Sequence, residues 1–196
     1  GAMSISIIIV LTTVIFGTVT ATAAFVSRAY GSKRFDRIPV ILAHSLYLAF
    51  AFALVLAIIG MFWSQDLLLL LGADLDVAMI GAQFLAPMLM GMTIFVFLMI
   101  LTTGFQSTGD SRTPMYVMVL VNIVNIILNP TLINGLGGFP AFGIAGSAYA
   151  SILSRACGVL LLLGVIYLLP SRKNGPVRFP KKWTFEPRLI KDITKV

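Results

Sequence analysis

Long stretches without a charged residue constrain this chain more than any other feature. Five of them follow one another along the sequence, over 5–26, 38–65, 77–105, 113–154 and 156–171. A helix that crosses the hydrocarbon core of a bilayer needs about 20 mostly apolar residues, and most of these stretches reach or exceed that length. They predict an integral membrane protein built of α-helices.

The composition points the same way. Hydrophobic residues make up 59% of the chain and charged residues 11%, whereas soluble domains have about 45–50% and about 25%. The mean hydropathy is +1.01. The net charge is +7, but the Lys and Arg residues gather in short segments between apolar stretches. That pattern indicates a lipid bilayer, and no nucleic acid, as the partner.

The apolar stretches resolve into five predicted helices. The fourth stretch is too long for one span and is interrupted at 134–140, where NGLGGFP is a strong turn signal. We therefore expect membrane-spanning helices at about 4–28, 38–64, 77–103, 113–133 and 142–170. The fold class is an all-α membrane protein. A helical bundle covers 1–170, and 171–196 is a basic cytoplasmic linker that begins a short amphipathic helix.

The distribution of basic residues predicts the orientation. Of the 14 Lys and Arg residues, all except Arg155 lie in the connections after the first and third predicted helices or in the tail. The connections 65–76 and 134–141 contain none. The positive-inside rule then places the N-terminus of this chain outside and the C-terminus in the cytoplasm. We expect a multi-pass protein of the plasma (cytoplasmic) membrane.

Three asparagines share one face of the fourth predicted helix. Asn122, Asn125 and Asn129 are spaced by three and four residues, and Pro130 removes a backbone hydrogen bond beside them. A carboxamide in hydrocarbon needs a partner or water. Two interpretations stay open: hydrogen bonds between helices, or a polar cavity that binds a cation or a substrate.

The fifth predicted helix carries a second polar face. Ser147, Ser151 and Arg155 are spaced by four residues, within a segment of small residues that suits close helix packing. Arg155 lies near the middle of the helix, and no acidic residue falls inside any predicted helix. A charged residue at this depth usually faces a cavity, a partner or a water-filled path, and snorkelling to the surface is the weaker alternative.

Enzyme motifs are missing from the sequence. There is no Cys or His cluster for a metal and no phosphate-binding loop, so we expect no cofactor. His44 stands alone, which favours a structural or interhelical role over a catalytic one. A membrane acyltransferase would need a catalytic His or acid at the membrane surface, and we do not expect an enzyme.

Several motifs resemble the MATE (multidrug and toxic compound extrusion) transporters. GFQSTGDSRTPM at 104–115 resembles the loop between that family's fourth and fifth helices. Three further segments are similar to the end of its second helix, to its fifth helix with the outer turn, and to the start of its sixth. They are AAFVSRAYG at 23–31, NIILNPTLINGLGGFP at 125–140 and GIAGSAYAS at 143–151.

The resemblance implies a partial lobe of a larger transporter. MATE proteins have twelve helices in two six-helix lobes, and the five predicted helices correspond to helices two to six. The missing first helix and the C-terminal lobe would be partners of this chain. In the family, a Na⁺ or H⁺ site uses an Asn and an Asp on the fifth helix and a hydroxyl on the sixth. Asn125 matches the Asn, Asn129 stands where the family has Asp, and Ser147 or Ser151 would supply the hydroxyl.

The function that this resemblance implies is secondary active efflux of drugs or organic cations, driven by Na⁺ or H⁺ through alternating access. Asn122, Asn125, Asn129, Ser147, Ser151 and Arg155 are the candidate cation- or substrate-binding residues, with a coupling Na⁺ near Asn125 and Asn129. One alternative is a lipid or lipid-linked saccharide flippase of the same superfamily, which Arg155 favours. The other alternative is a structural membrane subunit without transport activity.

Overall fold

The computed structural model describes residues 2–138, 140–168 and 177, except for the side chains of 2–12, 14, 15 and 136. Six helices and one 3₁₀ turn make up the described part, which contains no strand: α1 (Ala2–Gly31), α2 (Arg37–Leu70), α3 (Leu75–Met90), α4 (Met92–Ser107), α5 (Arg112–Asn134), η1 (Leu136–Gly138) and α6 (Ile144–Leu168). The predicted all-α fold is confirmed. The predicted linker and amphipathic helix at 171–196 lie outside the described residues, apart from residue 177.

The helices have the length and composition of membrane spans. Four spans long and apolar enough to cross a bilayer are found in the described part: α2, α3 with α4, α5 and α6. α1 is a further helix of 30 residues. Large apolar side chains point outward from the bundle; Phe62, Ile126 and Leu160 are 67–69% exposed. A surface of this kind suits contact with lipid rather than with water.

The third predicted helix is broken into α3 and α4. The break lies at Gly91, four residues after Pro87, and a proline inside a helix commonly kinks or breaks it. Pro87 has no N–H to donate, and its carbonyl accepts the Gly91 N–H at 2.9 Å. A Cβ at Gly91 would collide with Ile152 of α6. The glycine therefore lets α6 approach closely at the break.

Several helix ends differ from the predicted ones. α2 runs to Leu70 and α3 starts at Leu75, so the predicted connection 65–76 shortens to 71–74. The leucines at 67–71 continue the apolar helix until Gly72, whose φ of +90° ends it. Asp66 and Asp76 consequently lie inside helices, where we expected no acid, but both are close to helix ends. α6 starts at Ile144 rather than at 142.

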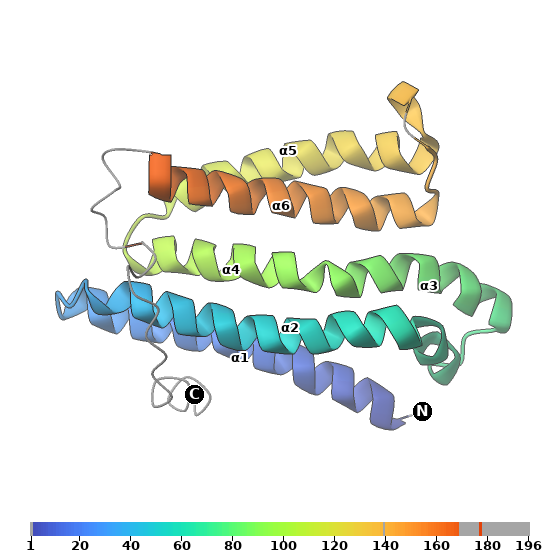
Figure 1. Ribbon diagram of the computed structural model, residues 1–196, viewed down its shortest axis with the longest axis horizontal. Helices are drawn as coiled ribbons and strands as arrows, with labels where there is room; N and C mark the ends of the chain where they lie inside the picture. Colours follow the sequence, from blue (N-terminus) through green and yellow to red (C-terminus); the bar gives the residue numbers. More distant parts are fainter. Residues whose placement is uncertain (1, 139, 169–176, 178–196) are drawn as a thin grey trace.

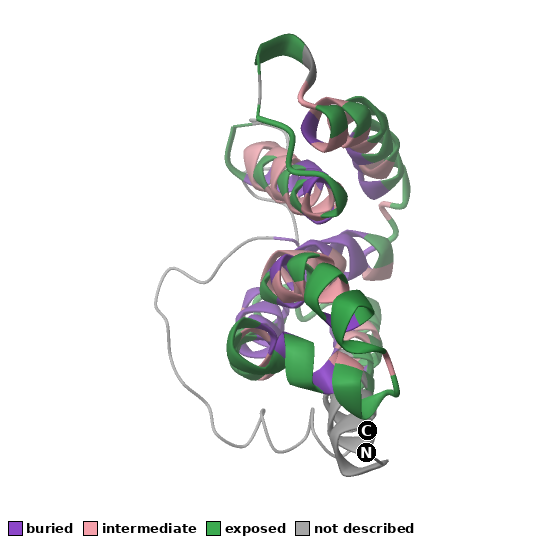
Figure 2. Ribbon diagram, turned by 90° about the vertical axis from the view of Figure 1, so that its right-hand side faces the viewer, coloured by how far each residue is buried: buried purple, intermediate pink, exposed green. Residues whose placement is uncertain are grey.

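The helices form an antiparallel bundle in three layers. α5 lies beside α6 on one side, α1 lies beside α2 on the other, and α3 with α4 runs between the two pairs (Figures 1 and 2). The most buried large side chains belong mainly to α2 and α4, among them Leu42, Ile100, Leu101 and Phe105. The α1–α2 and α4–α5 connections lie at one end of the bundle and the other two connections at the opposite end (Figure 1).

Candidate functional site

The α5–α6 pair provides the framework of the candidate site. The amide of Phe142 donates to the carbonyl of Leu132 at 2.9 Å, which folds the short connection back on α5. A Cβ at Gly146 would lie 2.5 Å from the Leu132 carbonyl oxygen, so the absence of a side chain lets the helix backbones approach closely. The two helices are antiparallel neighbours, and their polar faces meet.

Two asparagines of α5 and two serines of α6 form a polar cluster. Asn125 Nδ2 donates to Ser154 Oγ at 3.2 Å and to Ser151 Oγ at 3.4 Å. Asn129 Nδ2 donates to Asn125 Oδ1 at 2.9 Å, and Ser154 Oγ donates to the Ser151 carbonyl at 3.1 Å. These side chains are partly or fully buried. We call Asn125, Asn129, Ser151 and Ser154 the amide–serine cluster.

One buried oxygen of the cluster has no partner. Asn129 Oδ1 is buried and accepts no hydrogen bond from any described residue. A carbonyl oxygen that is removed from water without a donor costs free energy, typically about 1–3 kcal/mol. The cluster therefore offers an acceptor that a cation, a water molecule or a donor group on another part of the protein would satisfy.

Two of the predicted site residues do not join the cluster. Asn122 is exposed and donates to the Met118 carbonyl of its own helix at 2.9 Å. The surface of α5 that faces α6 carries Val121, Asn125 and Leu132, and Asn122 points away from it. Ser147 is partly buried and makes no hydrogen bond to the described residues. Neither side chain belongs to the amide–serine cluster, and of the two predicted hydroxyls Ser151 is the one that lies beside Asn125.

Arg155 lies against α4. Its guanidinium carbon lies 4.7 Å from the centroid of the Phe95 ring in α4, and the side chain is partly buried. It makes no hydrogen bond or ion pair with any residue of the described part. α6 faces α4 at this position, and the preceding residue, Ser154, is the one that reaches Asn125 of α5.

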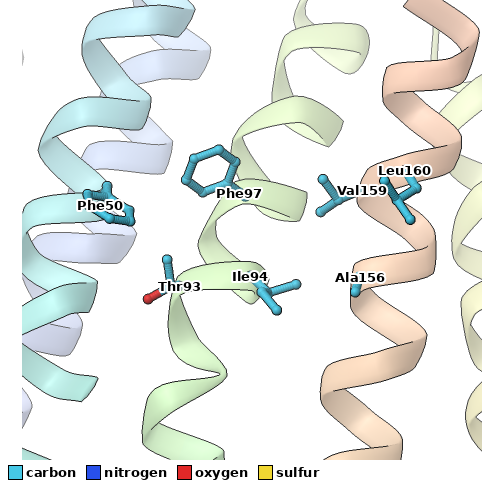
Figure 3. Close-up of a pocket in the computed structure, with 7 residues that line it drawn as sticks. All are labelled: Phe50, Thr93, Ile94, Phe97, Ala156, Val159 and Leu160. Atoms are coloured by element: carbon cyan, nitrogen blue, oxygen red, sulfur yellow. The ribbon is translucent and has the colours of Figure 1, made fainter. Parts of the chain in front are cut away.

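An apolar pocket opens between α2, α4 and α6 (Figure 3). Its volume is about 380 Å³, and its lining residues are Phe50, Thr93, Ile94, Phe97, Ala156, Val159 and Leu160. Phe50 and Phe97 contact each other edge to face, with ring centroids 6.4 Å apart. The pocket offers no charged group, so it suits only an apolar group.

His44 is packed inside the bundle. The side chain is 1% exposed, and Nδ1 lies 2.8 Å from the carbonyl oxygen of Val40, one turn earlier in α2. The Tyr47 ring packs edge-on against the imidazole at a centroid distance of 6.4 Å. His44 therefore contributes to helix packing, and none of these contacts involves the amide–serine cluster or Arg155.

Polar clusters and a charged residue at mid-depth in a bundle of long apolar helices are typical of the lobes of secondary transporters. The family model described as MatE matches residues 1–131, and the chain belongs to this family. The resemblance found in the sequence motifs is thereby confirmed.

Relatives and a solved structure agree with this assignment. The "Probable multidrug resistance protein YoeA" of Bacillus subtilis is 33% identical over 162 residues, which are 83% of this chain and 34% of that protein. The "FAD transporter" of Shewanella oneidensis is 30% identical over 164 residues, 84% of this chain and 36% of that protein. The chain spans about a third of the length of these relatives.

The fold is that of a solved MATE family transporter of the MOP superfamily in its inward-facing conformation. The two superpose with a TM-score of 0.81 at 24% sequence identity, over 95% of this chain and 41% of the other. The described bundle therefore has the fold of part of that larger protein.

Proposed function

We propose that this chain is part of a secondary active transporter that exports organic cations or other amphipathic drugs, driven by a Na⁺ or H⁺ gradient. The observation that carries the proposal is the amide–serine cluster, which places an unpaired acceptor oxygen, Asn129 Oδ1, inside a membrane-spanning bundle. Polar groups at membrane depth are costly to keep and usually mark an ion or substrate path. Alternating access would come from this lobe moving against the remainder of the transporter.

The chemistry of the cluster supports Na⁺ as the ion it would hold. Its oxygens belong to carboxamides and hydroxyls, which are hard, neutral ligands. Neither group takes up a proton in the physiological pH range. Coupling to H⁺ would therefore need a titratable residue elsewhere in the transporter. Within the cluster, Asn129 Oδ1 is the oxygen best placed to bind Na⁺, because it accepts no hydrogen bond from the described residues. Asn125 Oδ1 already accepts a hydrogen bond from Asn129 Nδ2.

A second candidate function is transport of an anionic cargo, such as a phosphate-bearing lipid headgroup. Arg155 supports it, because a cation at mid-depth attracts an anion. One relative carries the name FAD transporter, and FAD is a diphosphate with aromatic rings. Cargo of either charge is therefore compatible with the relatives of this chain.

The test uses the whole transporter in proteoliposomes, with export of a fluorescent organic cation measured under an imposed Na⁺ or pH gradient. Asn125→Ala removes the donor to both serines and the acceptor for Asn129, so we expect gradient-driven export to fall about tenfold or more. Asn122→Ala is the matched control, because Asn122 is exposed and outside the cluster. Equal export by the two variants would remove the cluster from the mechanism. Export that ignores both gradients would overturn the proposed function.

A further inference from the structure

We propose that Arg155 is the anion-recognising residue of the transporter and receives a carboxylate or phosphate group of the cargo. This inference rests on the proposed transport function and refines its substrate class. The cargo would be an anionic or zwitterionic amphipath rather than a purely cationic one. The depth of Arg155, the charges around it and its contact with Phe95 support this assignment.

Arg155 lies at the middle of its span. α6 has 25 residues, from Ile144 to Leu168, and Arg155 is the twelfth of them. At a rise of 1.5 Å per residue, the residue lies about 17 Å from the start of the helix. Its head group packs sideways on α4 instead of extending toward a membrane surface. A permanent cation at this depth usually faces a cavity, a partner or a water-filled path, and a negative group is the partner that suits its charge best.

The described part of the chain supplies no such partner. Its acidic residues all lie in connections or close to helix ends: Asp36, Asp66, Asp74, Asp76 and Asp110. Arg155 makes no ion pair with any described residue. The polar groups near it on the same helix, Ser151 and Ser154, are neutral and are already engaged with Asn125. Among the described residues, no negative charge therefore compensates the guanidinium of Arg155.

The contact with Phe95 positions the guanidinium without satisfying it. A ring face attracts the charge but offers no lone pairs to the five N–H donors of the side chain. Those donors form a planar fork that matches a carboxylate or a phosphate with two parallel hydrogen bonds. Both Phe95 and Arg155 are only partly buried, so a ligand can reach the pair. Phe95 acts as a positioning residue that holds the fork in place.

The first experiment measures binding, which does not depend on transport. We would follow the fluorescence polarisation of carboxyfluorescein, an anionic xanthene dye, with the whole transporter in detergent. Rhodamine 6G has the same ring system with a positive charge and serves as the paired probe. Arg155→Gln should weaken carboxyfluorescein binding at least about tenfold and leave rhodamine binding unchanged. Arg155→Lys should keep part of the affinity, because it keeps the charge but loses the fork.

Two further variants complete the design. Arg34→Gln removes one positive charge from the exposed α1–α2 connection. The binding of both dyes should stay unchanged in this variant, which controls for the effect of net charge. Phe95→Leu removes the ring face but keeps the guanidinium, so carboxyfluorescein binding should fall only about two- to fivefold. If the Gln variant does not fold, Arg155→Met replaces it, since Met is similar in length and suited to lipid.

The outcomes separate this proposal from the transport function. Carboxyfluorescein binding that is unchanged in Arg155→Gln, or reduced equally for both dyes without rescue by Arg155→Lys, would overturn the proposal. So would the failure of both neutral variants to fold, which would mean that Arg155 pairs with an acid elsewhere in the transporter. Gradient-driven export of rhodamine 6G would still support the proposed function in each case. Selective carboxyfluorescein binding without export of either dye would support the anion site and contradict the transport function.

Discussion

Asn129 is the residue of the amide–serine cluster that bears most directly on the proposed cation site. Its Oδ1 is the acceptor left without a partner, and its Nδ2 donates to Asn125. The cluster as it stands is neutral and has no group that exchanges protons. A carboxylate in the same place would add a full negative charge beside Asn125, which contacts the serine hydroxyls of α6.

Replacing this amide by a carboxylate tests whether the cluster holds a cation. Asn129→Asp should increase the apparent affinity for Na⁺, because the cation gains a charged ligand. It should also make transport depend on pH: a carboxylate can take up a proton, so transport should fall as the pH is lowered. Asn122→Asp is the control, since that side chain is exposed on the surface of α5. Export by proteoliposomes across a range of Na⁺ concentrations and pH values checks both effects.

A cluster that binds no cation would respond differently. Asn129→Asp would then leave the Na⁺ dependence and the pH profile as they are in the unchanged transporter. A mere loss of expression or thermal stability in this variant would indicate a structural amide and would remove Asn129 from the candidate site.

The sequence predicted three of the four residues of the amide–serine cluster. Asn125, Asn129 and Ser151 were identified because spacings of three and four residues mark a helix face and the motifs resemble a known family. Ser154 was missed, although it lies three residues after Ser151 and so shares its side of α6. Phe95 had no signal at all within an apolar segment. Which neighbour a helix face meets depends on the packing of the bundle, and spacing along one helix does not contain that information.

At the scale of helices, the α5–α6 contact is fixed by Gly146. A Cβ there would lie 2.5–2.8 Å from backbone atoms of residues 132 and 133, and backbone cannot move aside as a flexible side chain can. Gly164 lies in the same helix, yet a Cβ there would meet only the tip of Leu168, at 3.8 Å. The same substitution can therefore be made at a closely packed position, Gly146, and at an open position of the same helix, Gly164.

Replacing each glycine by alanine separates packing from helix propensity. Alanine favours a helix over glycine by about 1 kcal/mol, so Gly164→Ala should be neutral or stabilising. Gly146→Ala should cost about 1–3 kcal/mol, because the added methyl group separates α5 from α6. Thermal unfolding of the whole transporter in detergent measures the difference. A Gly146→Ala variant as stable as Gly164→Ala would show that the close approach of the two helices contributes little.

The order of the membrane spans along the chain was largely predictable, but the residues at which the helices end were not. Uncharged stretches define spans because lipid excludes charge, which identified α2, α5 and α6 and the α3–α4 span. The helices end where backbone hydrogen bonding stops, however, and the charge pattern does not mark that point. α2 continues past Asp66 to Leu70, and the helix break in the third span occurs at Gly91, where Ile152 of α6 packs.

At the scale of the whole molecule, the connections separate charge between the two ends of the bundle. The end with the α1–α2 and α4–α5 connections carries five basic residues: Arg28, Lys33, Arg34, Arg37 and Arg112. The opposite end carries Asp66, Asp74 and Asp76 and no Lys or Arg within the described residues. Basic residues close to spans are retained in the cytoplasm, so the first end should face the cytoplasm.

Labelling of single cysteines in intact cells tests this orientation. In a cysteine-free transporter with Cys157→Ser, the variant Ala73→Cys places a thiol in the 71–74 connection, and Ser111→Cys places one beside α5 at the basic end. A membrane-impermeant maleimide should label Ala73→Cys in intact cells and Ser111→Cys only after permeabilisation. The opposite pattern would reverse the predicted topology. The five basic residues would then face outward, contrary to the charge rule from which the orientation was predicted.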